Sequence, residues 1–214
     1  MPIGRRYELI KWAEDNDSYI LEDDYDSELR YFGKPIPALQ GLDRSGRVVY
    51  LGSFSSTLFA SIKISYMVLP HELVEVFNRI KSRYAQTCSK AEQICLALYM
   101  EDGYYHRHIK KCRKRNAEKL HTTMEMFKEY GDGLIEAIDS KSGLAVMLRI
   151  MLPVPAEQLC QLAKNVGLMM NPVSDLCTEE VLYFYFYRVS EPLLRLLIKM
   201  YVGNIKKGMR YLNE

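Results

Sequence analysis

The first half of the chain alternates between amphipathic segments and short apolar runs. Apolar side chains recur at helical spacing over residues 5–15, and apolar runs at residues 19–21, 48–51 and 64–69 have the length of short buried strands. Turn-forming residues separate the runs, including two prolines and two glycines within residues 32–41. The pattern predicts an α/β fold, in which helices cover a sheet.

Three helices are predicted in the middle of the chain. Residues 71–85 carry apolar side chains mostly at i, i+3 and i+4. Ser89 is a suitable N-cap for a second helix that ends near Asp102. Residues 104–130 form a third, long helix, with six basic residues within 107–115. We interpret these cations as a solvated or interdomain helix face rather than as a nucleic-acid site.

The composition changes after Gly131. The pattern predicts two strands, a helix, an aromatic strand and a closing helix, at residues 134–138, 143–152, 155–166, 182–189 and 191–212. Gly203 is expected to interrupt the closing helix, and the aromatic run is interpreted as a core strand rather than a platform for stacking bases. This order predicts a small α+β lobe. We therefore expect a partial large lobe, a long connecting helix and a small lobe, at residues 1–103, 104–130 and 131–214.

Composition and charge place the chain among ordinary globular proteins. Of its 214 residues 48% are hydrophobic and 26% charged, and the formal net charge is +2. Bulk electrostatics therefore favour neither a nucleic-acid nor a membrane partner. No run approaches the roughly 20 apolar residues that span a bilayer, and the N-terminus lacks a signal-peptide pattern. We expect a cytoplasmic protein.

The cysteines and histidines predict neither a disulfide framework nor a metal site. The five cysteines form no C-x-x-C pair, so reduced, buried thiols are the favoured interpretation, at Cys88, Cys95, Cys112, Cys160 and Cys177. His106 and His108 are two residues apart, and this spacing directs two helical side chains to different faces. We therefore expect no metal ligands.

Two polar clusters follow two of the predicted strands. Residues 22–26 read EDDYD, and residues 52–57 read GSFSST, with Lys63 a few residues further on. Hydroxyls and backbone N–H groups between strands suit a phosphate or another anion. A carboxylate with a tyrosine two residues later suits a pyridine cofactor with a cationic ring nitrogen. Taken alone, the acidic cluster also suits a solvated turn.

Together these clusters resemble a known family. EDDYDSELRY, then GKPIPALQGLDRSGRVVYLGSFSSTLFASIKISYMVLP, then YYHRHIKKCRKRN look like the aminotransferase-like domain of MocR-type transcriptional regulators of the GntR family. Such proteins join a winged-helix DNA-binding domain to a fold-type-I domain that resembles pyridoxal-phosphate-dependent aminotransferases. The resemblance runs from Met1 to about Lys206 and implies only the C-terminal part of that domain. The implied fold is α/β: a partial large-lobe sheet with helices, a long connecting helix and a small α+β lobe.

The resemblance implies roles for five residues. Asp23 matches the carboxylate that pairs with the pyridine nitrogen of pyridoxal 5'-phosphate, and Tyr25 matches the tyrosine that hydrogen-bonds the 3-hydroxyl of the ring. Ser53 and Ser55 match the hydroxyl positions beside the cofactor phosphate. Lys63 stands where the family usually has an arginine for that phosphate. A lysine keeps the charge but loses the bidentate fork of arginine.

Two departures from the family pattern concern catalysis. Ser56 stands where the family has the lysine that forms the Schiff base with the cofactor. A serine can neither form this bond nor shuttle the α-proton, so its presence implies a loss of several powers of ten in rate. Tyr183 stands where an arginine usually binds the substrate carboxylate. Arg188, near the end of the same predicted strand, is a substitute candidate for substrate binding, with a structural salt bridge as the alternative.

The resemblance therefore implies a truncated, non-catalytic or nearly non-catalytic aminotransferase-like domain, in which binding of pyridoxal phosphate is weak or lost. Two alternatives stay open. One is a pyridoxal-phosphate-dependent aminotransferase whose N-terminal half is a separate chain, and the other is a module that senses an amine or amino acid. A truncated sheet exposes strand edges and apolar surface, so we expect a homodimer or a complementing chain to cover them.

Overall fold

The computed structural model of the chain divides into two compact units. The first comprises Met1–Glu28 and Gly33–Ile109, and the second comprises Leu29–Phe32 and Lys110–Glu214. Helix α5 (Tyr104–Tyr130) contributes residues to both. The three-part division expected from the sequence stays a prediction. The structure describes residues 1–33, 36–59, 61–138, 143–173 and 181–212, so the expectation for Cys177 falls outside the described residues. The expectation of buried thiols is wrong for the other four cysteines, since Cys95 is exposed and Cys88, Cys112 and Cys160 are half-buried.

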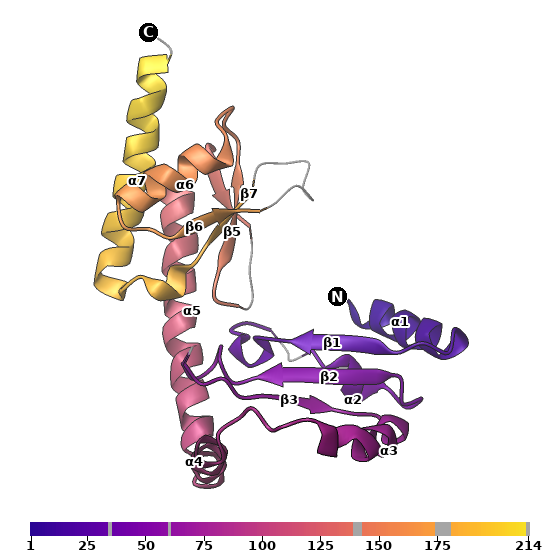
Figure 1. Cartoon of the computed structure of the whole chain (residues 1–214). Helices are drawn as coiled ribbons and strands as arrows, with labels where there is room; N and C mark the ends of the chain where they lie inside the picture. The colour runs from indigo at the N-terminus through magenta and orange to yellow at the C-terminus, as the bar shows by residue number, and fades with distance from the viewer. Residues whose placement is uncertain (34–35, 60, 139–142, 174–180, 213–214) are drawn as a thin grey trace. The chain divides into compact units, whose positions relative to one another are not determined.

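The first unit is built on a three-stranded sheet (Figure 1). Strand β1 (Ile20–Asp24) runs parallel to β2 (Val48–Ser53), and β2 pairs antiparallel with β3 (Ser65–Val68). The register places Asp23 opposite Leu51. Because β1 and β2 are parallel, their carboxyl ends lie side by side at one edge of the sheet.

Two helices pack beside this sheet. Helix α1 (Ile3–Asp15) and the short helix α2 (Leu39–Leu42) contribute to a small buried cluster of Ile10, Leu39 and Val48. The amphipathic pattern of residues 5–15 thus predicted α1 correctly, although of its apolar side chains Ile10 and Ala13 are buried while Tyr7 and Trp12 are each 54% exposed.

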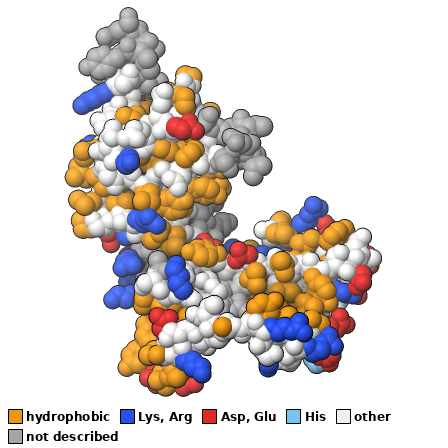
Figure 2. Space-filling model, viewed as in Figure 1, with side chains coloured by type: hydrophobic (Ala, Val, Ile, Leu, Met, Phe, Trp, Pro, Cys, Tyr) orange, Lys and Arg blue, Asp and Glu red, His pale blue; other side chains and the backbone are white. Residues whose placement is uncertain are grey.

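Much apolar surface of the first unit is uncovered in the part of the chain that the structure describes. Helix α3 (His71–Ile80) has no buried residue, and α4 (Lys90–Glu101) buries only Leu96. On the sheet, Leu21 is 70% exposed and Met67 50% exposed. Figure 2 shows hydrophobic side chains at the surface of this unit.

The second unit contains a four-stranded antiparallel sheet of order β4-β5-β7-β6. Its elements are β4 (Ile135–Ala137), β5 (Val146–Ile150), α6 (Ala156–Asn165), β6 (Met170–Pro172), β7 (Val181–Phe184) and α7 (Glu191–Leu212). The core is large: Leu148, Phe184, Ile198 and Tyr201 are fully buried. The ring of Phe127 on α5 meets Phe184 edge-on, with centroids 6.0 Å apart. No helix of the described residues is long and apolar enough to cross a membrane.

The fold class predicted from the sequence is confirmed, but three local predictions are wrong. Strand β6 was not predicted, because three residues ending in a proline carry no alternating pattern. The aromatic strand ends at Phe184, and the chain turns into a 3-10 segment, Phe186–Arg188, so Arg188 is not in a strand. Helix α7 continues through Gly203, because buried neighbours such as Val202 and Ile205 outweigh the helix penalty of about 1 kcal/mol for glycine.

Candidate functional site

The two polar clusters predicted from the sequence meet at the carboxyl ends of β1 and β2. The strand register places Asp24 opposite Gly52, so the chain leaves both strands at the same edge. The side chain of Ser56 then joins the two loops, because its Oγ donates a hydrogen bond to the backbone oxygen of Tyr25. In sheets of this kind, ligands bind off the carboxyl ends of the strands.

The acidic cluster separates into carboxylates with different roles. Glu22 is structural: its carboxylate accepts hydrogen bonds from the backbone N–H groups of Leu39 and Gln40, at 2.7 and 3.0 Å, and lies 3.5 Å from the guanidinium of Arg6. It therefore satisfies N–H groups at the start of α2 that no side chain at the N-cap position satisfies. Neither the sequence spacing nor the acidic composition indicates this role.

Asp24 is also engaged within the protein, and Asp26 is partly buried. The hydroxyl of Tyr50 donates to Asp24 Oδ2 at 2.7 Å. Burial, together with the charge of Asp24, raises the pKa of the Asp26 carboxyl. Asp23, by contrast, is exposed and has no hydrogen bond or ion pair within the described residues. It is therefore the carboxylate of the cluster that is available to a ligand.

Asp23 lines a shallow concavity of about 370 Å³ at this edge of the sheet. The strands supply its lining, which consists of Asp23, Leu51, Gly52, Ser53, Ser65, Tyr66 and Met67. A Cβ at position 52 would overlap the ring of Tyr66, so glycine permits the aromatic ring to lie directly on the strand. The structure thus brings Asp23 and Ser53 together, as the resemblance implies.

The hydroxyls of the polar loop form a short chain of hydrogen bonds. Ser53 Oγ donates to Ser55 Oγ at 3.2 Å and accepts from the Ser55 backbone N–H at 3.3 Å. Ser55 Oγ in turn donates to the carbonyl oxygen of Ile62 at 2.8 Å. Both hydroxyls and the N–H therefore already donate to acceptors of the protein, and the hydroxyls would serve the oxygens of an anion only by turning away from these acceptors.

Four predicted site residues of the first unit, Tyr25, Ser55, Ser56 and Lys63, do not line the concavity. The ring of Tyr25 is 54% exposed and its hydroxyl has no hydrogen bond within the described residues. Lys63 is exposed, and its carbonyl oxygen accepts a hydrogen bond from Cys88 Sγ at 3.5 Å. Its ammonium forms no ion pair within the described part of the chain.

Residues of α5 anchor the polar loop, and the sequence analysis did not predict this contact. Thr57 is 2% exposed, its Oγ1 lies 3.1 Å from the Tyr105 hydroxyl, and its carbonyl oxygen lies 2.9 Å from His108 Nε2. Burial raises the pKa of Tyr105. The spacing of Tyr105 and His108, three residues apart on a helix, places them on one face and was the available signal. No group of three metal-ligating side chains occurs within the described residues.

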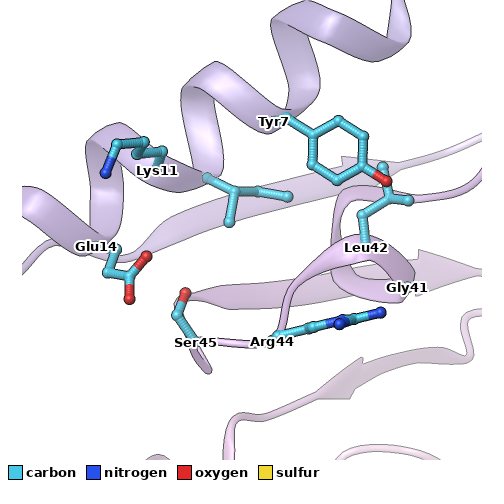
Figure 3. A pocket seen from close by; sticks show the side chains of 8 residues that line it. Tyr7, Lys11, Glu14, Gly41, Leu42, Arg44 and Ser45 are labelled. Atoms are coloured by element: carbon cyan, nitrogen blue, oxygen red, sulfur yellow. The ribbon is translucent and has the colours of Figure 1, made fainter.

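A second hollow, of about 560 Å³, lies between α1 and the segment after α2 (Figure 3). Tyr7, Lys11 and Glu14 line it from the helix, and Arg44 and Ser45 line it from the facing segment. The ammonium of Lys11 is engaged with Asp15 at 3.3 Å. None of the residues that the sequence singles out lies in this hollow, so it is separate from the candidate site.

Arg188 belongs to the second unit and is exposed. Its Nε donates to the Tyr187 hydroxyl at 2.8 Å, and its guanidinium lies 5.5 Å from the centre of the Tyr187 ring and 5.9 Å from that of Tyr185. No carboxylate pairs with Arg188 within the described residues. The structural salt bridge considered from the sequence is therefore absent from this part of the chain.

Comparisons with known proteins find transcriptional regulators and aminotransferases that are similar to this chain. No protein-family model matches it. The HTH-type transcriptional regulator YdeL of Bacillus subtilis is 41% identical over 174 residues, which are 81% of this chain and 38% of YdeL. The "Probable rhizopine catabolism regulatory protein MocR" of Rhizobium meliloti is 34% identical over 174 residues, which are 81% of this chain and 35% of that protein. The chain thus spans well under half the length of these relatives.

Solved structures show the same fold. Kynurenine aminotransferase of Pyrococcus horikoshii superimposes with a TM-score of 0.83 at 24% identity, over 97% of this chain and 52% of that one. The multiple substrate aminotransferase of Thermococcus profundus gives a TM-score of 0.82 at 25% identity, over 99% and 53%. These proteins have the fold-type-I architecture. The chain is therefore homologous to the aminotransferase-like part of MocR-type, GntR-family transcriptional regulators.

Proposed function

We propose that this chain is a non-catalytic, ligand-binding aminotransferase-like domain of a transcriptional regulator, in which the cofactor site persists without its covalent anchor. The observation that carries the proposal is the position of Ser56. Its hydroxyl bonds the backbone of Tyr25 and closes the loop where the family has a reactive amine. A serine there supplies neither the imine bond nor the proton shuttle.

The residues present fit part of pyridoxal phosphate. Asp23 offers a free carboxylate for the protonated ring nitrogen. The hydroxyls of Ser53 and Ser55 can donate to phosphate oxygens once they turn away from their present acceptors, Ser55 Oγ and the carbonyl oxygen of Ile62. Bound pyridoxal phosphate supplies an electrophilic aldehyde and an electron-withdrawing ring. In this chain we expect non-covalent contacts only, and therefore weak binding of the cofactor.

Equilibrium dialysis with pyridoxal phosphate tests whether this site binds. We expect saturable binding that Asp23→Asn and Ser53→Ala each weaken, because each removes one contact to a charged group of the cofactor. Asp15→Asn, at an exposed position on α1, is the matched control and is expected to bind like the unmodified chain. Saturable binding of pyridoxal phosphate with the same affinity in both site variants as in the unmodified chain would reject the assignment of the site.

We infer further that another polypeptide covers the exposed apolar faces of the first unit. The supporting observation is β3, whose four residues are all exposed at the edge of the sheet, next to the unburied helix α3. An exposed strand edge beside apolar surface favours pairing with a further strand. This observation also favours the alternative of an aminotransferase completed by a second chain.

Native mass spectrometry tests this inference on the chain as purified. A homodimer, or a stable complex with a co-expressed N-terminal half from a relative such as YdeL, is the expected result. Regained transamination in the second complex would favour the split enzyme over the non-catalytic domain. A monomer under both conditions, with Leu21 and Met67 freely accessible to oxidation or labelling, would contradict the inference.

A further inference from the structure

A buried lysine in the second unit serves no role that the homology assigns. Lys119, on α5, is 6% exposed, and its ammonium donates hydrogen bonds to the carbonyl oxygens of Tyr187 at 3.0 Å and Val189 at 2.6 Å. Burial lowers the pKa of Lys119, as does the charge of Arg115, while the charge of Glu191 acts in the opposite direction. No ion pair of Lys119 occurs within the described residues, and burying an ammonium without one costs free energy, so its placement calls for an explanation.

The two carbonyl groups bound by Lys119 are those on either side of Arg188. This segment is a 3-10 turn rather than a strand, and so lacks the ladder hydrogen bonds that would hold its backbone. Lys119 supplies two bonds from the helix in their place. One ammonium thus fixes the backbone both before and after the arginine.

The side chain of Arg188 is held as well. Nε donates to the Tyr187 hydroxyl at 2.8 Å, Nη1 donates to Met169 Sδ at 3.0 Å, and the guanidinium lies by the rings of Tyr185 and Tyr187. A guanidinium has five N–H donors. Two are engaged within the described residues, so three are available, including both on Nη2. A fixed arginine with free donors is suited to bidentate binding of a carboxylate.

We infer that Lys119 is a positioning residue for carboxylate recognition by Arg188. The ligand class is a small organic carboxylate, bound through the free N–H groups of the guanidinium. The inference deepens the proposed ligand-binding function and rests on it, but it concerns the second unit and requires no cofactor. Pre-organisation is its physical basis, since an arginine that is already fixed loses less conformational entropy on binding.

NMR of the full chain with ¹⁵N-labelled arginine tests this inference, using sodium propionate as the probe. We expect a saturable shift of the Arg188 Nε–H signal, assigned by its loss in Arg188→Lys. Propionamide, which has the same shape without the charge, is expected to cause no such shift. Equal responses to the two compounds, or no saturation with propionate, would overturn the assignment of a carboxylate site.

Substitutions of the lysine separate positioning from general stability. Lys119→Met is expected to weaken propionate binding by about tenfold, the effect of losing one charge-assisted hydrogen bond, and to broaden the Arg188 Nε–H signal. Lys119→Arg, which keeps charge and donors, is expected to restore much of both. Lys128→Met, at an exposed position near the end of α5, is the matched control. Unchanged binding in a folded Lys119→Met protein would refute the positioning role.

Tyr187→Phe keeps the inference testable if Lys119→Met does not fold. This change removes only the hydroxyl that accepts from Arg188 Nε and leaves both lysine bonds intact. We expect propionate binding to weaken by about threefold to tenfold, and unchanged binding would count against a fixed guanidinium. Failure of pyridoxal phosphate to bind would leave these results unaffected, so the two proposals fail separately.

Discussion

Within one acidic cluster, Glu22 and Asp23 are neighbours in sequence with opposite roles, and substitutions distinguish them. Glu22→Ala removes the acceptor for two backbone N–H groups at the start of α2 and the partner of Arg6, whose side chain is 17% exposed. Hydrogen bonds to a charged group contribute about 1.5–3 kcal/mol each. Because Gln40 is exposed, we expect a combined loss of about 2–4 kcal/mol in the free energy of unfolding of the first unit.

Asp23→Ala provides the contrast. Its carboxylate is exposed and has no bond within the described residues, so we expect a change of about 0.5 kcal/mol or less in the free energy of unfolding. The same substitution is expected to weaken pyridoxal phosphate binding. Glu22→Gln, which retains one acceptor oxygen, is expected to lie between the two, at about 1–2 kcal/mol.

Urea denaturation followed by tryptophan fluorescence measures these differences. Trp12 is the single tryptophan of the chain and lies in α1, so its emission reports on the first unit alone. A single-unit probe is needed, because two compact units need not unfold together. The reasoning would be refuted if Glu22→Ala and Asp23→Ala unfolded at the same urea concentration.

Four further substitutions test local features. Burial acts to raise the pKa of the Asp43 carboxyl, but hydrogen bonds from the following turn outweigh this effect and lower the pKa below 3.8. The stability that Asp43 contributes is therefore fully present above pH 3.8. It is lost as the pH falls through the lowered pKa. Urea titrations of Asp43→Asn should show this pH dependence removed. Gly131→Ala should destabilise the second unit by about 1–3 kcal/mol, because a Cβ at this position would overlap two backbone carbonyl oxygens. Gly203→Ala should instead stabilise α7 by about 0.5–1 kcal/mol, because the space around Gly203 is open. Tyr201→Phe should raise the thermal unfolding temperature, because the buried hydroxyl has no partner within the described residues and its removal relieves about 1–3 kcal/mol of desolvation cost.

The sequence predicted the elements of the fold because their patterns are local. The spacing of apolar residues in the sequence is sufficient to predict α1, α5 and β2. It does not predict where β7 ends. Tyr185 to Arg188 have strong strand propensity, yet tertiary bonds from Lys119 hold this segment in a 3-10 turn.

In the candidate site, only the residues that match the family motifs were predictable from the sequence. The resemblance gave Asp23, Ser53 and Ser55, and the register of β1 and β2 brings Asp23 and Ser53 to one concavity. The capping role of Glu22 and the anchoring of Thr57 depend on contacts between residues far apart in sequence. Such contacts follow from the assembled fold and not from any local pattern.

The most direct test of the central claim is borohydride reduction of the chain with pyridoxal phosphate, followed by peptide mass spectrometry. The account predicts no stoichiometric phosphopyridoxyl adduct at any single lysine, because Ser56 occupies the position of the reactive amine. Ser56→Lys is the positive control and is expected to acquire an adduct at residue 56. A stoichiometric adduct at one lysine of the unmodified chain, for example Lys63, would contradict the account.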